Sequence, residues 1–314
     1  MTPASFAELF GLRHAVVSAP MAKISGGRLA AAVTEAGGLG LIGGGYGDRA
    51  WMRREWEIAA NPRVGVGLIL WVIPDAVEVV DELMNWGVRT FCFAFGDPAA
   101  VIDRVRARGG RSLVQINTPQ EARSALAAGA DAVIAQGEEA GGHGQSGRPL
   151  RDLLPAVVEL AGRMPVLAAG GITTRSDVAA AVARGASGVL VGTRFYATDE
   201  ALDLPAAKRR LVEAGSDATT RTSAFDHLRG PLWPEGYNGR ALHNSATEWW
   251  AGSQASEAEV AQRQDRYRSA DLSGDLDFRV VWAGAGVSRI GRIQSASAVT
   301  ADLAAGLNGA NCES

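Results

Sequence analysis

Short apolar runs alternate with alanine-rich amphipathic stretches along the chain as far as Phe195. Each apolar run ends in glycine or in a polar loop, which is typical of a strand buried on both faces. We interpret eight of these runs as strands, namely Ala15–Ser18, Leu39–Ile42, Val64–Ile69, Val88–Phe93, Leu113–Ile116, Ala132–Ala135, Val166–Ala169 and Gly188–Val191. The stretches between them have helical spacing, namely Leu29–Ala36, Ala50–Ala60, Ala76–Trp86, Ala99–Ala107, Gln120–Ala128, Leu153–Ala161 and Ser176–Arg184.

Alternating strands and helices predict a parallel sheet with right-handed crossovers. A parallel sheet is covered by helices on its outer face, which agrees with the near-continuous apolar character of the runs. Eight strands favour an α/β protein built on a closed (β/α)8 TIM barrel, whose usual size is about 250 residues. A doubly wound open sheet is the competing architecture.

Several helix ends have recognisable capping sequences. Thr118-Pro119-Gln120-Glu121 predicts a capping box with proline at the first helical position. Thr174 and Asp177 have the spacing of a second cap. Glycines stand where three helices should end, at Gly87, Gly129 and Gly185.

The pattern changes after Phe195. Leu204–Glu213 and Ser256–Arg268 have helical spacing, and the segment between them is rich in glycine, proline, arginine and aromatic residues. We interpret this part as an inserted, mostly helical lid or substrate subdomain over the barrel mouth. The predicted organisation is a barrel over residues 1–214, the insertion over 215–279, and a return to the barrel over 280–314 that ends in a helix, Ser295–Leu307, and a loose tail. The aromatic residues of the insertion are expected either in its core or against a ligand; they include Phe225, Trp233, Tyr237, Trp249 and Trp250.

Composition excludes several classes of protein. The 314 residues are 47% hydrophobic and 21% charged, as in an ordinary globular protein. A net charge of −3 argues against a dedicated nucleic-acid binder. Two cysteines and four scattered histidines predict neither a disulfide framework nor a metal site. The longest apolar run, Val64–Ile73, is too short to span a bilayer, and the first residues lack a signal-peptide pattern, so we expect a cytoplasmic protein whose oligomeric state the sequence leaves open.

His143 is the sharpest candidate for catalysis. It lies in the glycine-rich loop Gln136–Gly144, which follows the sixth predicted strand. The carboxyl ends of barrel strands are where such enzymes place their active sites. An imidazole at this position can act as a base near neutral pH, and its glycine neighbours allow a ligand to approach. The alternative is a loop histidine bonded to backbone, which the position at the mouth disfavours.

Two glycine-containing turns predict a phosphate site. Gly170-Gly171 follows the seventh predicted strand, and Gly192-Thr193 follows the eighth. These two loops commonly bind phosphate in TIM barrels, and the helix that starts near Thr174 would add amide donors at its N-terminus. Ordinary tight turns are the alternative for both loops.

Three further features point to the same mouth. Ser18-Ala19-Pro20-Met21-Ala22 ends the first strand and offers a flat backbone on which a ring could lie, although a methionine there could equally be core. Gln115 and Gln136 end neighbouring strands and point amides to the mouth, or else only to backbone or solvent. The run Gly38–Gly43 matches G-x-G-x-x-G, but a helix precedes it and a strand runs through it, so we reject a dinucleotide site.

Together these segments resemble the nitronate monooxygenase family. The resemblance extends weakly to Trp233-Pro234-Glu235 and Gly284-Ala285-Gly286, so it covers nearly the whole chain. Its strongest parts are Ala19-Pro20-Met21, Ala135-Gln136-Gly137 with Ala140-Gly141-Gly142-His143, Gly170-Gly171-Ile172, and Gly192-Thr193-Arg194-Phe195. The Ala-Gly-Gly-His segment is fairly specific to this family, whereas the two glycine loops occur in many FMN barrels.

The resemblance implies a barrel that binds FMN noncovalently and a substrate domain near the C-terminus. The phosphate would lie on the two glycine loops, and the flavin ring against Pro20–Ala22 with Gln136 and Gly141 nearby. The full set of implied cofactor-binding residues is Pro20, Met21, Ala22, Gly67, Gln115, Gln136, Gly141, Gly142, Gly170, Gly171, Gly192 and Thr193. His143 matches the family's catalytic histidine. Family members oxidise alkyl nitronates with O2 to a carbonyl compound and nitrite, so a small-molecule substrate and O2 are the expected partners.

Two positions depart from the family's usual residues. Many members have asparagine near the end of the third strand, where this chain has Gly67, and glutamine near the C-terminus, where it has Ala285. Both changes remove polar groups from the mouth. Two alternatives therefore stay open. One is an FMN- and NAD(P)H-dependent enoyl-thioester reductase, and the other is a non-catalytic protein that binds flavin or another phosphate ligand.

Overall fold

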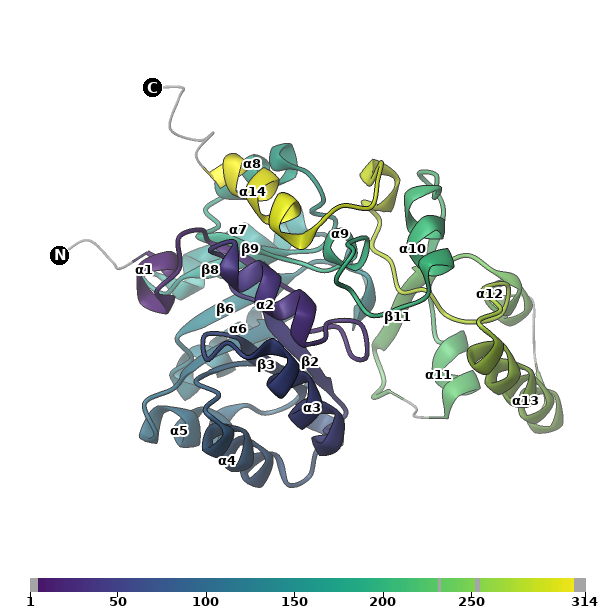
Figure 1. Cartoon of the computed structure of the whole chain (residues 1–314), viewed down its shortest axis with the longest axis horizontal. Helices are drawn as coiled ribbons and strands as arrows, with labels where there is room; N and C mark the ends of the chain where they lie inside the picture. The colour runs from purple at the N-terminus through teal and green to yellow at the C-terminus, as the bar shows by residue number, and fades with distance from the viewer. Residues whose placement is uncertain (1–4, 231–232, 252–254, 308–314) are drawn as a thin grey trace.

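A computed structural model describes residues 5–230, 233–251 and 255–307 of the chain. It consists of a barrel with a smaller lobe beside it (Figure 1). The lobe is formed by the chain that follows α10 (Pro205–Val212), before the last helix returns to the barrel. The predicted tail after Leu307 and Cys312 lie outside the described residues.

Eight parallel strands form the barrel, in the sheet order β1-β9-β8-β6-β5-β4-β3-β2. A parallel bridge between Val17 and Leu39 joins the two ends of this order. The TIM-barrel prediction is therefore confirmed, and the open sheet is excluded. The strands are β1 Val16–Ser18, β2 Leu41–Gly45, β3 Gly65–Ile69, β4 Thr90–Ala94, β5 Arg111–Ile116, β6 Ala132–Gln136, β8 Val166–Ala169 and β9 Gly188–Val191.

Helices cover the outside of the barrel. Those between the strands are α2 Gly27–Glu35, α3 Arg49–Ala59, α4 Ala76–Trp86, α5 Ala99–Ala107, α6 Pro119–Ala128, α7 Leu150–Ala161 and α8 Arg175–Val182. After β9 come the short α9, Thr193–Tyr196, and α10. The final helix α14, Ala296–Leu307, packs against α8 and α2 and so completes the ring. Short 3-10 helices lie at η1 Leu70–Val72 and η2 Val287–Arg289, and α1 is Phe6–Phe10.

The strands are buried on both faces because successive side chains point to opposite sides. Val17, Leu113 and Ile134 belong to an inner cluster that also includes Phe6 from α1. Val16 and Val133 belong to the larger cluster between the sheet and the helices. This double burial is the physical reason for the near-continuous apolar runs in the sequence.

The predicted N-terminal caps are present, whereas the C-cap of α8 is Ala183 rather than the predicted Gly185. The Thr118 hydroxyl accepts the amide of Glu121, and the Glu121 carboxylate accepts the amide of Thr118, so both halves of the capping box form. Thr174 and Asp177 form the same arrangement at the start of α8. Caps of this kind contribute about 1 kcal/mol each. Gly87 and Gly129 end their helices in the left-handed conformation, as predicted.

The lobe is largely helical but also contains two strands that the sequence did not predict. Its helices are α11 Ala224–Arg229, α12 Ser245–Ala251 and α13 Glu257–Ser273. The strands β10, Thr219–Thr222, and β11, Tyr237–Leu242, form an antiparallel sheet whose third strand is β7, Gly142–Gln145. Because β7 belongs to the loop that contains His143, this sheet joins the lobe directly to the barrel mouth. The division at residues 214 and 279 stays a prediction.

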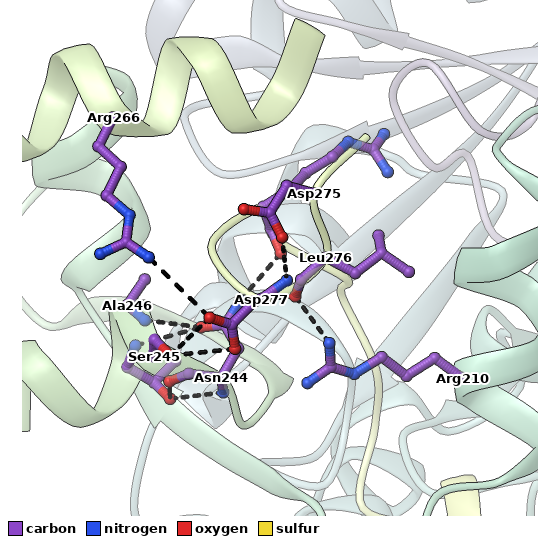
Figure 2. A network of polar contacts seen from close by, with 10 residues as sticks. Arg210, Asn244, Ser245, Ala246, Arg266, Asp275, Leu276 and Asp277 are labelled. Carbon is purple, nitrogen blue, oxygen red and sulfur yellow. Dashed lines mark hydrogen bonds and ion pairs between the residues drawn. The ribbon is translucent and has the colours of Figure 1, made fainter. Parts of the chain in front are cut away.

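A polar network anchors the lobe to α10 (Figure 2). The Arg210 guanidinium donates to the carbonyl of Leu276, at 2.7 Å. It also donates to the carbonyl of His243, at 3.0 Å. The Asn244 carboxamide oxygen accepts the amides of Ala246 and Thr247 at the start of α12. The Leu276 carbonyl thus accepts from Arg210 of α10 and also from the Asn244 carboxamide just before α12. This network helps to fix where the lobe's helices stand relative to the barrel.

Candidate functional site

One cavity lies at the carboxyl ends of the barrel strands. Every residue that the sequence predicts for the site lines it: Pro20, Met21, Ala22, Gly67, Gln115, Gln136, Gly141, Gly142, His143, Gly170, Gly171, Gly192 and Thr193. Residues from six different strands, or from the loops that follow them, therefore meet at one place. The structure thus brings together residues that are far apart in the sequence.

A chain of amides forms part of the cavity wall. The Gln136 side-chain oxygen accepts hydrogen bonds from the carboxamides of Gln115, at 3.1 Å, and of Asn117, at 2.9 Å. The Gln136 carboxamide nitrogen donates to the carbonyl of His143, at 3.3 Å. Gln136 and Asn117 are both buried. The two predicted glutamines are therefore bonded to one another and to the histidine loop, and Asn117 is a third member that the sequence did not predict.

His143 stands in the middle of β7, opposite Gly239 of β11. Its Nε2 atom lies 2.7 Å from a carboxylate oxygen of Asp226, and the two side chains are 8% and 5% exposed. Asp226 lies on α11, 83 residues further along the chain. Burial lowers the pKa of His143 below its usual value, and this effect outweighs Asp226, which raises it. The imidazole is therefore neutral at physiological pH, with Nε2 as the donor to the Asp226 carboxylate.

Aromatic rings enclose the histidine. The indole of Trp233 stacks on the imidazole with ring centroids 3.7 Å apart and planes at 6°. Trp282 packs at 5.0 Å from the same ring, and Phe95 meets Trp233 edge-on at 4.9 Å. All three aromatic residues line the cavity. Among the aromatic residues of the insertion, Trp233 lines the cavity, whereas Phe225 lies in the lobe's core. The expectation of a ligand contact and the expectation of a core position therefore each hold for one of these residues.

Two arginines of the lobe hold the histidine strand in place. The Arg221 Nε donates to the carbonyl of Glu138, and its Nη1 donates to the carbonyl of Gly144, at 3.1 and 3.2 Å. The Arg240 Nε also donates to the Glu138 carbonyl, at 3.1 Å. Burial lowers the pKa of Arg221 to about 10. These contacts tie both sides of the Gly141–Gly142 turn to the lobe.

The glycine loops after β8 and β9 lie beside the start of α8, where some of the backbone amides are already bonded. The Asp177 carboxylate accepts the amides of Thr173 and Thr174, both at 2.9 Å. These two amides at the start of α8 are therefore already bonded and do not add to an anion site, contrary to the expectation from the helix N-terminus. Arg289 lies beside the same carboxylate, at 3.2 Å, and offsets its charge. The loops Gly170-Gly171 and Gly192-Thr193 themselves line this end of the cavity.

Three further residues that the sequence did not single out come from the insertion and the returning chain. Asp226, Arg229 and Trp282 reach the cavity or its histidine from segments far from the barrel loops. No sequence motif identifies these three residues, because their positions in the site depend on how the lobe docks on the barrel. The aromatic content of the insertion was the available indication, and it pointed to Trp233 without separating it from core residues.

None of the helices within the described residues combines the length and the apolar character that crossing a membrane would need. Within those same ranges, no three His, Cys, Asp or Glu side chains stand in an arrangement that could hold a metal ion.

Comparison with known proteins places the chain in a family. The family model described as nitronate monooxygenase matches residues 4–62 and 50–306. A nitronate monooxygenase of Neurospora crassa is 30% identical, over 88% of this chain and 84% of that protein. The solved structure of a nitroalkane oxidase from Streptomyces ansochromogenes is 31% identical, with a TM-score of 0.80, and covers 97% of this chain and 98% of its own.

A relative with a different name is more alike over a shorter stretch. A (3aS,4S,5R,7aS)-5-hydroxy-7a-methyl-1-oxo-octahydro-1H-indene-4-carboxyl-CoA dehydrogenase of Mycobacterium tuberculosis is 36% identical over 70% of this chain, and the match spans 63% of that protein's length. The names of the family and of these relatives indicate an oxidoreductase. The family model accounts for most of the chain, and the resemblance predicted from the sequence motifs is confirmed. The chain belongs to the nitronate monooxygenase family.

Proposed function

We propose that this protein catalyses the FMN-dependent oxidation of alkyl nitronates by O2 to a carbonyl compound and nitrite, with His143 as the base or anion-binding residue. The observation that carries the proposal is the position of His143. It lines the cavity beside every residue expected to bind FMN, and it is buried and bonded to Asp226 at 2.7 Å. Such a pairing orients an imidazole and fixes which of its nitrogens is basic.

The cavity suits FMN. A Cβ atom at Gly142 would meet no atom within 4 Å, and one at Gly192 would come no closer than 3.5 Å to its nearest neighbour, the Ala19 Cβ. At both positions the absence of a side chain leaves open space in the cavity wall. The glycine loops after β8 and β9 would hold the phosphate, and Pro20–Ala22, Gln136 and Gly141 would hold the ring system. When bound, FMN would supply the electron transfer between the nitronate and O2.

The chain's own residues supply a base for proton transfer and shield that base from bulk water. Because Asp226 accepts from Nε2, the Nδ1 atom of His143 carries the free lone pair. With its pKa lowered by burial, the neutral ring can take the α-proton of a nitroalkane or contact the oxygens of a nitronate. Trp233 and Trp282 shield the imidazole from bulk water. These are the features that a base in a partly desolvated site requires.

The departure at Gly67 has a steric cause in this chain. A Cβ atom at Gly67 would lie 2.3 Å from both Cβ and Cγ of Pro20. The larger side chain that many family members carry there is therefore incompatible with the position of Pro20. We expect Gly67→Ala to displace the Pro20–Ala22 loop, to lower the melting temperature and to reduce the FMN retained after dialysis, because overpacking of this kind costs roughly 1–3 kcal/mol.

The matched control for Gly67 is Gly215→Ala. Gly215 is exposed, and a Cβ atom there would meet nothing within 4 Å. Thermal unfolding and the flavin absorbance of dialysed protein measure both variants. Equal flavin retention by Gly67→Ala and wild type would contradict the proposed role of the Pro20 loop.

An anaerobic visible spectrum tests the proposed function. The purified protein, supplied with FMN, is titrated with an alkyl nitronate and then exposed to air. Flavin bands that bleach with nitronate and return in air with release of nitrite are the expected result. Protein that binds no FMN, or whose bands ignore nitronate, would overturn the proposal.

The same experiment separates the alternatives. The second candidate is the reductase, and the carboxyl-CoA substrate in the name of the Mycobacterium tuberculosis relative, a dehydrogenase, supports only its thioester part. Bands that bleach with NAD(P)H and recover on addition of an enoyl thioester would establish it. Bound flavin with no turnover on either substrate would instead favour the non-catalytic binding protein.

A further inference from the structure

Arg229 is the cationic side chain of the cavity. It lies in the last turn of α11, one turn after Asp226. Among the described residues that line the cavity there is no aspartate, glutamate or lysine, and Arg229 is the single arginine. The remaining wall is glycine, aliphatic or aromatic residues and neutral polar side chains. A permanent positive charge therefore faces an otherwise uncharged chamber.

The guanidinium of Arg229 has no ionic partner of its own. Across residues 5–230, 233–251 and 255–307, no hydrogen bond or ion pair is formed by its side chain. The nearby carboxylate, Asp226, is bonded to His143 instead. Arg229 is close enough to His143 to lower the pKa of that ring electrostatically. The positive charge of Arg229 and the imidazole of His143 thus act on the same part of the cavity.

The other arginines near the histidine are already bonded. Arg221 donates to the carbonyls of Glu138, Gly144 and Asn238, and Arg240 donates to the Glu138 carbonyl. Neither of them lines the cavity. Arg229 differs from both because its five N–H donors are not bonded within the described protein and its side chain is exposed to the cavity mouth.

We propose that Arg229 selects the anionic form of the substrate by pairing its guanidinium with the two oxygens of a nitronate. This inference rests on the proposed function and assigns its substrate class: a planar, two-oxygen anion with an apolar substituent. A guanidinium fork matches such an oxygen pair in the way it matches a carboxylate. The aromatic side chains of Trp233, Trp282 and Phe95 would receive the apolar part.

The pairing has a further consequence for ligands that do not react. A short carboxylate has the same planar oxygen pair as a nitronate, so butanoate should bind at the same place and compete with it. Arg229 is exposed, so salt should weaken this binding. The charge-assisted contact should be worth about tenfold in affinity, the lower part of the range for a hydrogen bond to a charged group.

The test compares Arg229→Gln with Arg268→Gln in the FMN-loaded protein. Arg268 is an exposed arginine of α13 that is paired with Asp265 and does not line the cavity, so its replacement removes the same charge from the same lobe. Two quantities are measured: the dissociation constant of butanoate by calorimetry, and the ratio of kcat/KM for a nitronate to that for its neutral nitroalkane.

The expected result is an about tenfold weaker binding of butanoate and a similar fall in the nitronate-to-nitroalkane ratio for Arg229→Gln, with the control at wild-type values. Butanoate binding that is unchanged in Arg229→Gln, or an equal loss with nitronate and nitroalkane, would overturn the inference. Butanoate binding that depends on Arg229 in a protein without nitronate turnover would support the anion site and reject the proposed reaction. The two proposals can therefore fail separately.

Discussion

Replacing His143 with alanine is expected to reduce turnover on nitroalkanes and nitronates by ~10²–10⁴-fold while FMN stays bound. The imidazole is the titratable base of the cavity wall, and its burial keeps it neutral at physiological pH. Most of the residues expected to hold FMN lie on other loops. Gln136, Gly141 and Gly142 share the loop of His143 but stay unchanged in the variant, so we expect the cofactor to stay bound. Steady-state nitrite release and the flavin absorbance of the purified variant measure the two effects.

Loss of fold is the competing explanation for a dead His143→Ala variant. The substitution leaves Asp226 buried without its partner, which costs about 1–3 kcal/mol. A His143→Gln variant keeps a hydrogen-bonding side chain at this position, and thermal unfolding of both variants shows whether the barrel persists. Wild-type turnover in a folded, FMN-bound His143→Ala variant would remove His143 from the mechanism.

Replacing Asp226 with asparagine is expected to have the second-largest effect on catalysis. We expect kcat/KM to fall roughly 10- to 100-fold, because the variant loses a charge-assisted hydrogen bond that orients the imidazole. Asp226 is a positioning residue, since it contacts the base and does not line the cavity. Asp226→Ala, which cannot accept a hydrogen bond, should lose more than Asp226→Asn.

The pH profile separates positioning from a merely structural role. In the wild type, burial lowers the pKa of His143 and Asp226 raises it, with a lowered value as the net result. Removing the carboxylate leaves burial unopposed, so the pKa falls further. A base is active above its pKa, and the acidic limb of the kcat/KM profile should therefore move to lower pH in Asp226→Asn.

Asp265→Asn is the control for charge removal, because Asp265 is an exposed carboxylate of α13 that is paired with Arg268. Its pH profile should match that of the wild type. An acidic limb that stays in place in Asp226→Asn, or that moves equally in Asp265→Asn, would contradict the assignment of Asp226.

Local pattern was enough to predict the barrel. The apolar runs at Leu113–Ile116 and Val166–Ala169 fall within β5 and on β8, because strands buried on both faces leave an unmistakable pattern in the sequence. The caps at Thr118 and Thr174 depend on residues three positions apart and were equally predictable. The mouth loops followed, since they are the segments after each strand. The predicted site residues of these loops accordingly line one cavity.

The lobe's contribution to the site could not be predicted in the same way. His143 was expected in a glycine-rich loop, but Gly142–Gln145 is a strand because β11 pairs with it across more than 90 residues of chain. That pairing places α11 next to the mouth and so brings Asp226 to His143 and Arg229 to the cavity. None of these residues belongs to a sequence motif from which its contact partner could be predicted.

The sequence by itself therefore determined the barrel, the caps and the glycine-rich mouth, because these depend on periodicity and on contacts between near neighbours. Only the tertiary structure decided which carboxylate orients His143, which cation faces the cavity and which tryptophans enclose it. The physical reason is that these contacts arise when two separately patterned parts of the chain dock. The energy of docking depends on surfaces that exist only after each part has folded.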